Sequence, residues 1–105
     1  MRIDKFTTSL QTAMAEAQAA AVNGDHSTIE PEHLLLAMLQ QQGGSIKPIL
    51  DKSGVDVAGF SDLLSAKIDQ LPTLSQATGE VSLSPNLARL LNLADKFAAD
   101  SGDSF

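Results

Sequence analysis

Glu30 and His33 are the residues whose types and spacing come nearest to a metal site in this sequence. The Glu-x-x-His spacing is used by di-iron helical bundles, in which carboxylates and imidazoles from several helices converge on the metals. Such a site needs a second Glu-x-x-His pair, and the sequence contains none. His26 lies in a polar stretch and has no partner set either. We therefore expect no metal and no cofactor, and we keep a small metal-dependent helical enzyme as an alternative.

No other combination of residues indicates catalysis. Serine and threonine are plentiful, but most stand at helix starts or in loops, where their hydroxyls have structural roles. Cysteine is absent, which excludes disulfides, thiolate nucleophiles and thiolate metal sites. The G-x-x-x-x-G-K-[ST] phosphate-binding motif is also absent, so this chain is not expected to hydrolyse ATP. These absences favour a non-catalytic binding domain.

Composition narrows the range of partners. The chain has 13 acidic and 7 basic residues and a net charge of −6, which argues against a nucleic-acid or anionic-membrane surface. It has no Tyr or Trp and only 4 Phe, so an aromatic platform for single-stranded nucleic acid is unsupported. No apolar run approaches the roughly 18 residues of a membrane span, and MRIDKFTTSLQ lacks the apolar core of a signal peptide. We expect a cytoplasmic protein.

The stretch Ile29–Gly44 predicts the central helix of the fold. Glu30 stands at the N-cap and Pro31 at the first helical position, where its missing N–H costs nothing. Gly43-Gly44 ends the run. The apolar residues at helical spacing are Leu34, Leu35, Met38 and Leu39. A helix this apolar should be largely buried, so we expect Leu35→Ala to be among the most destabilising substitutions.

Four further helices are predicted at about residues 5–22, 45–52, 56–71 and 84–102. Their expected N-caps are Asp4, Ser45, Asp56 and Ser84. Asn23-Gly24 should end the first helix in a left-handed conformation. Residues 73–83 have no periodic pattern and are expected to form a loop, and no segment shows the period of two that a strand would require. The fold class is therefore all-α, with five helices.

These residues also carry a family resemblance. Glu30-Pro31, His33-Leu34-Leu35, Ala37, Leu39 and the following glycine resemble the first-repeat motif of the Clp N-terminal domain. The sequences MRIDKFT and LSPNLARLLNLADKFAADSGDSF are most similar to the ClpB type, whose parent is a protein disaggregase. The resemblance covers essentially all of the chain.

The resemblance implies a pair of four-helix repeats related by a pseudo-twofold axis. Residues 1–71 would form a complete first repeat, and residues 72–83 a loop between the repeats. Residues 84–105 would then form the first helix of a second repeat that is truncated after it. The sequence agrees, because Ala98-Ala99 before Gly102 echoes Ala20-Ala21 before Gly24.

The resemblance further implies a substrate-binding domain that captures unfolded or aggregated polypeptide for the hexameric ATPase ring of its parent chaperone. Its site would be an apolar groove with Thr7 and Asp103 on the rim, both exposed and of little importance for stability. Leu91, on the apolar face of the last helix, belongs to the same expected site. An adaptor-docking N domain of a protease-linked Clp unfoldase remains the alternative within the family.

Truncation of the second repeat would leave part of the last helix uncovered. Its apolar stripe comprises Leu87, Leu90, Leu91, Ala94 and Phe97. We expect a bare apolar strip along this helix, and either a homodimer through it or a marginal monomer that binds hydrophobic dyes.

Overall fold

The structure is a computed structural model that describes residues 6–76 and 79–102 of the chain. Five helices and two short strands follow one another in the described part. In chain order these are α1 (Thr8–Asn23), β1 (Thr28–Ile29), α2 (Pro31–Gln40), α3 (Ile46–Lys52), α4 (Val57–Asp69), β2 (Ser82–Leu83) and α5 (Pro85–Ser101). The predicted five-helix, all-α class is confirmed.

The two strands are a correction to the sequence prediction. β1 and β2 pair in parallel, with Thr28 opposite Ser82 and Ile29 opposite Leu83. The sequence pattern placed Ile29 at the head of the central helical stretch and Ser82-Leu83 in a loop, because a strand of two residues is too short to show a period of two. The pairing joins the start of α2 to the start of α5 across a long stretch of chain. The proposed repeat boundaries at residues 71 and 83 stay predictions.

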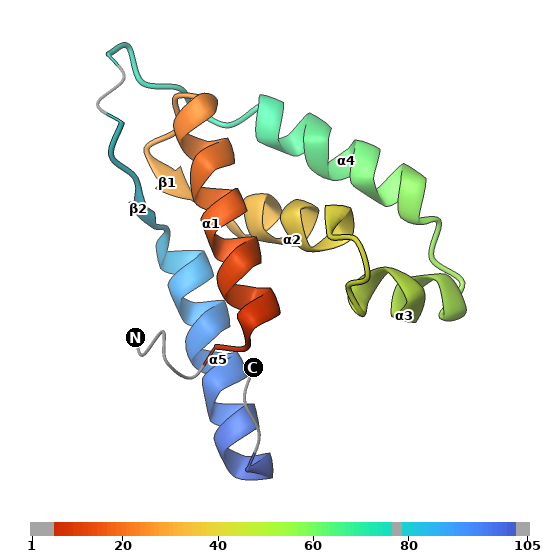
Figure 1. Cartoon of the computed structure of the whole chain (residues 1–105). Coiled ribbons are helices and arrows are strands. Elements are labelled where there is room, and N and C mark those ends of the chain that lie inside the picture. The colour runs from red at the N-terminus through yellow and green to blue at the C-terminus, as the bar shows by residue number, and fades with distance from the viewer. Residues whose placement is uncertain (1–5, 77–78, 103–105) are drawn as a thin grey trace.

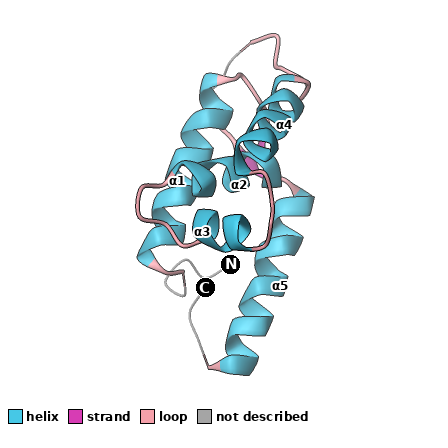
Figure 2. Ribbon diagram, turned by 90° about the vertical axis from the view of Figure 1, so that its right-hand side faces the viewer, coloured by secondary structure: helices cyan, strands magenta, loops and turns pink. Residues whose placement is uncertain are grey.

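Helix α2 lies crosswise at the centre of the molecule (Figure 1). It packs between α1 on one side and α4 on the other, and α3 continues from its far end. Helix α5 follows β2 on the side away from α4, and its last turns extend beyond the other helices in both views (Figures 1 and 2). The prediction that the Leu-rich helix is central is confirmed.

The main core lies where α1, α2, β1 and α5 meet. Alanines on one face of α1 allow α2 to approach closely, because they add little side-chain bulk between the backbones. Leu34, Leu87 and Leu91 fill the remaining space. The buried members are Phe6, Ala13, Ala17, Ala21, Ile29, Leu34, Ala37, Leu87 and Leu91.

A second, smaller core lies between α2, α3 and α4. It contains buried Leu39, Val57 and Leu64. Leu35 packs against this cluster but is only partly buried, whereas Leu34 is 5% exposed in the main core. Leu34→Ala should therefore lower the free energy of unfolding more than Leu35→Ala.

Helix α1 begins later than predicted. Its N-cap is Thr7, whose hydroxyl accepts a hydrogen bond from the Leu10 N–H at 3.2 Å. The predicted cap, Asp4, lies outside the described residues. Asp and Thr are both good N-caps, so local chemistry alone does not choose between two candidates three residues apart.

The other predicted helix starts are confirmed, but α2 ends at Gln40 with an extended Gln41 as its C-cap, before the predicted stop at Gly43-Gly44. Asp56 accepts from the Gly59 N–H at 3.2 Å, and Ser84 accepts from the Leu87 N–H at 3.0 Å. Ser45 occupies the N-cap of α3 without a side-chain hydrogen bond. The left-handed conformation predicted at Asn23-Gly24 is wrong, because Gly24 has φ −87° and the residue with positive φ is Asp25 at 59°.

Leu87→Ala should lower the free energy of unfolding by about 2–5 kcal/mol, because the Leu87 side chain is fully buried and its truncation leaves a cavity. Leu93→Ala, on the same helix but 51% exposed, should change stability by no more than about 0.5 kcal/mol. Urea denaturation of the two variants beside the wild type measures the difference. Equal midpoints for the two variants would show that α5 is not packed as described.

Candidate functional site

A groove of 320 Å³ lies between the start of α1, the C-terminal half of α2 and the middle of α5. We call it the α1–α5 groove. Thr7 and Leu91, which the sequence assigned to one binding site, both line it, so the structure brings these two residues together. Asp103, the third predicted residue, lies outside the described residues. The groove is lined by Thr7, Ser9, Leu10, Leu34, Met38, Gln41, Ser45, Leu90, Leu91 and Ala94.

The inner wall of the groove is apolar and belongs to the core. Leu34 is 5% and Leu91 only 2% exposed, so both are packing residues that show little surface to a ligand. Leu91 also lines a second apolar hollow, of 510 Å³, together with Phe6, Met14 and Leu83. Leu90 is 48% exposed and offers the accessible apolar surface in the α1–α5 groove.

The rim of the groove is polar and uncharged. Gln41 donates from Nε2 to the Ser9 carbonyl at 2.9 Å, and its Oε1 accepts from the Ser9 hydroxyl at 3.1 Å. This double contact ties the start of α1 to the end of α2. None of the described residues that line the groove is charged. Sequence reasoning missed Ser9 and Gln41, because their contact joins residues that are far apart in the chain.

Helix α5 has two apolar faces, of which only one is buried. Leu87, Leu91 and Ala98 pack inward. Leu90, Leu93 and Phe97 are 48%, 51% and 64% exposed and form what we call the α5 strip. A bare apolar strip is therefore present as predicted, but of the five residues named for it only Leu90 and Phe97 are exposed; Leu87 and Leu91 are core residues, Ala94 is half-buried, and Leu93 is not among the five. A homodimer through this strip stays a prediction, which sedimentation at micromolar and submicromolar concentration would test.

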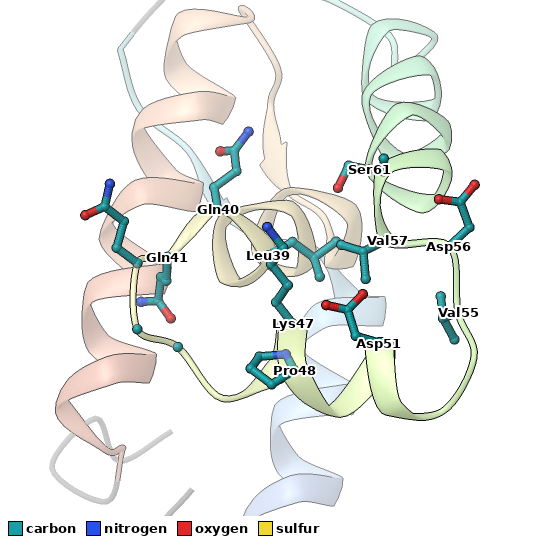
Figure 3. A pocket seen from close by; sticks show the side chains of 14 residues that line it. Leu39, Gln40, Gln41, Lys47, Pro48, Asp51, Val55, Asp56, Val57 and Ser61 are labelled. Carbon is teal, nitrogen blue, oxygen red and sulfur yellow. The ribbon is translucent and has the colours of Figure 1, made fainter.

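A wider hollow lies elsewhere, between the end of α2, α3 and the start of α4 (Figure 3). It has a volume of 1020 Å³. Charged and amide side chains dominate the labelled lining, including Gln40, Lys47, Asp51 and Asp56. Leu39 and Val57 contribute mainly as members of the smaller core. What distinguishes this hollow from the α1–α5 groove is its charged side chains, which an apolar segment of an unfolded chain would have to desolvate.

The structure brings Glu30 and His33 together, but as a helix cap. The Glu30 N–H donates to Nδ1 of His33 at 2.8 Å, and the Glu30 carboxylate accepts from the Thr28 hydroxyl at 2.7 Å. His33 Nε2 lies 3.0 Å from Nδ1 of His26, which the sequence had left without a partner. Within the described residues, no three His, Cys, Asp or Glu side chains gather closely enough to hold a metal.

Both rings of this pair are buried, with His26 6% and His33 1% exposed. Burial lowers the pKa of His33 because it disfavours the charged ring, and the neighbouring His26 lowers it further. The Glu30 carboxylate opposes both effects. His33 is therefore held in its neutral form at neutral pH.

The family model of the Clp repeat (R) N-terminal domain matches residues 5–105. The chain belongs to this family. It is 52% identical to the chaperone protein ClpB of Pseudomonas putida and 42% identical to that of Vibrio cholerae, each over 105 residues. Both alignments cover 100% of this chain and 12% of the relative. The chain thus spans about an eighth of the length of these relatives, and its sequence resemblance to the ClpB type is confirmed.

Solved structures show the same Clp N-domain fold. The crystal structure of the Hsp104 N-terminal domain from Candida albicans superposes with a TM-score of 0.84 at 20% identity, covering 95% of this chain and 65% of that one. A structure described as part of a malarial protein secretion system superposes with a TM-score of 0.74 at 17% identity, covering 91% of this chain and 65% of that one.

No helix in the described ranges is long and apolar enough to cross a membrane.

Thr7→Ala should lower the free energy of unfolding by about 1 kcal/mol, because it removes the hydroxyl that caps α1. From the sequence, Thr7 is expected to matter little for stability. The hydrogen bond from the Leu10 N–H to its hydroxyl gives it a structural role as well. Thr7→Ser keeps the capping oxygen and should retain most of this stability. Thermal or urea denaturation measures the effect, and a loss of equal size in both variants would contradict the capping role.

Proposed function

We propose that this domain captures exposed apolar segments of unfolded or aggregated polypeptides in the α1–α5 groove. It would pass them to the hexameric ATPase ring of a ClpB-type parent chaperone in the cytoplasm, and it would itself be non-catalytic. The observation that carries the proposal is a groove with an apolar wall and an uncharged polar rim, beside exposed Leu90. Membership in the Clp N-domain family and the ClpB relatives support it.

The chemistry of the groove favours weak and sequence-tolerant binding. An apolar wall gains free energy from any aliphatic or aromatic side chain, at roughly 1.5–3 kcal/mol gross for each one buried. A groove of 320 Å³ holds only a few such side chains, and ordering an unfolded segment cancels part of the gain. We expect dissociation constants of about 1 μM or higher, so that the binding free energy is no more favourable than roughly −8 kcal/mol. Several domains on one ring would raise the apparent affinity by avidity.

The absence of charge from the described groove lining has a measurable consequence. Contacts between charged groups weaken as salt screens them, whereas apolar contacts do not. Capture in the groove should therefore be nearly constant between about 50 and 500 mM salt. A steep loss of binding with salt would place the interaction on the acidic outer surface instead.

Leu90→Gln should weaken the binding of a permanently unfolded, reduced and carboxymethylated protein about fivefold to tenfold, because it removes accessible apolar surface from the groove. Leu63→Gln is the matched control, since Leu63 is 52% exposed on α4, away from the groove. Fluorescence anisotropy measures both affinities, and denaturation checks that both variants are folded.

Equal affinity of the wild type, Leu90→Gln and Leu63→Gln would overturn the assignment of the groove. A one-to-one complex with a folded partner, together with no binding of the unfolded protein, would favour the adaptor-docking alternative. The metal-dependent alternative has lost its main support, because Glu30 and His33 are engaged in a helix cap.

A further inference from the structure

We propose that the buried pair His26–His33 is an acid-sensitive lock that anchors the start of α5 to the rest of the domain. The lock consists of three groups in a row: the Glu30 N–H, the His33 ring and the His26 ring. This inference does not depend on which ligand the α1–α5 groove binds.

The hydrogen bonds fix the position of each ring proton. A backbone N–H can only donate, so Nδ1 of His33, 2.8 Å from the Glu30 nitrogen, must be the acceptor and carry no proton. The neutral His33 ring then has its proton on Nε2 and donates it to Nδ1 of His26 at 3.0 Å. His26 must in turn carry its own proton on Nε2. The geometry thus assigns the Nε2–H tautomer to both rings.

One additional proton on either ring breaks this chain. A proton on Nδ1 of His33 would face the Glu30 N–H, so that two donors would meet where a hydrogen bond had been. A proton on Nδ1 of His26 would face the Nε2–H of His33 in the same way. Both rings are more than nine-tenths buried, so solvent cannot easily supply replacement acceptors. The lock is therefore satisfied only when both rings are neutral.

The lock lies where α1, α2 and the segment between α4 and α5 meet. His26 follows α1, and His33 lies in the first turn of α2. His26 also lines a small hollow with Leu74, Gly79 and Val81 of the segment between α4 and α5. That segment is held by a hydrogen bond of 2.8 Å from the Leu74 N–H to the Asp25 carbonyl.

The same junction continues into α5. Strand β1 lies between His26 and His33 in the chain and pairs with β2. The Ser84 N–H, just after β2, donates to the Ile29 carbonyl at 3.0 Å. Ser84 is the N-cap of α5, so the first turn of this helix is held by β1, whereas its middle is held by the main core. Figure 1 shows β1 and β2 side by side next to α1, with α5 running on from β2. Opening the lock should loosen this attachment before it affects α4.

Of the carboxylates near the lock, Glu30 at the cap of α2 attracts a proton to His33. Asp25, in the turn after α1, and Glu80 line the small hollow beside His26. Burial and the proximity of the second ring act in the opposite direction, and for His33 they prevail, so its pKa in the folded domain is lowered.

The sign of the pH dependence follows from this lowered pKa. The stability that depends on neutral His33 is fully present above about pH 6.5, the ordinary value for an unfolded chain. It is lost as the pH falls from there towards the lowered pKa of the folded domain, because the unfolded chain takes up the proton first.

Gly24 provides an independent indication that the ring position matters. With φ −87° its backbone would suit any residue. A Cβ atom at this position would lie 2.6 Å from Cε1 and 2.9 Å from Nδ1 of His26, which is too close. The missing side chain thus makes room for the ring, and Gly24→Ala should displace His26 and open the lock without any change of pH.

Nitrogen NMR of the histidine rings tests the lock directly in the wild-type domain. At pH 7.5 the neutral His33 ring should carry its proton on Nε2, and Nδ1 of His26 should be the acceptor of its hydrogen bond. A neutral His33 ring with its proton on Nδ1, or a charged His33 ring at this pH, would overturn the proposal. This measurement needs no variant and so does not depend on whether a substituted domain folds.

Amide hydrogen exchange then tests the coupling to α5. Between pH 7.5 and 5.5, above the range in which ordinary carboxylates titrate, protection factors at the start of α5 should fall about tenfold, with a smaller change in α4. His33→Asn keeps an oxygen near the Glu30 N–H but cannot titrate, so its protection should be lower at pH 7.5 and nearly constant over this range. Gly24→Ala should resemble the acid form at pH 7.5.

Two outcomes would overturn the proposal. Equal loss of protection in α4 and α5 would show that the pair contributes to global stability without anchoring α5. An identical pH dependence in the wild type and in folded His33→Asn would show that the acid sensitivity comes from other groups.

Discussion

Burial of α2 between α1 and α4 is the interaction on which the other elements depend. One face of α2 places Leu34 and Ala37 against α1 and α5, and another places Leu39 against Val57 and Leu64. A helix with polar residues along either face could join only one of these clusters. Because both cores share this helix, a change at its first turn reaches α1, the strand pair and α5 together.

Helix α5 connects the stability of the domain to its proposed function. Its inner face completes the main core through Leu87 and Leu91, while Leu90 faces the groove and belongs to the α5 strip. The start of the same helix is further tied to β1 through the two-residue strand β2 and one hydrogen bond from its cap. Leu90 thus stands on a helix that the core holds in place, and its exposed apolar surface suits sequence-tolerant capture because apolar contacts are non-directional.

This arrangement of helices belongs to the Clp N-domain family, and the chain spans about an eighth of the length of its ClpB relatives. The Hsp104 N-terminal domain shares the fold at only 20% identity, so the packing of these helices tolerates wide change in sequence. That tolerance is expected where cores accept any apolar side chains of suitable total volume.

The sequence by itself determined the elements whose causes are local. The cap and proline at Glu30-Pro31 and at Ser84-Pro85 specified where α2 and α5 start, and the glycine at 102 specified where α5 stops, because each signal acts within one or two turns. The family motif lies in these same local segments, which is why it could be recognised from the sequence. The association of Thr7 with Leu91 came from the family resemblance rather than from spacing.

Tertiary structure decided what depends on residues that are distant in the chain. Whether Leu34 or Leu35 enters the main core depends on where α1 lies, and adjacent leucines carry no signal that distinguishes them. The β1–β2 pair and the contact of Gln41 with Ser9 join segments that share no local pattern. His33 was singled out for its spacing from Glu30, but only the fold placed His26 against it and turned a candidate ligand pair into a buried hydrogen-bonded cap.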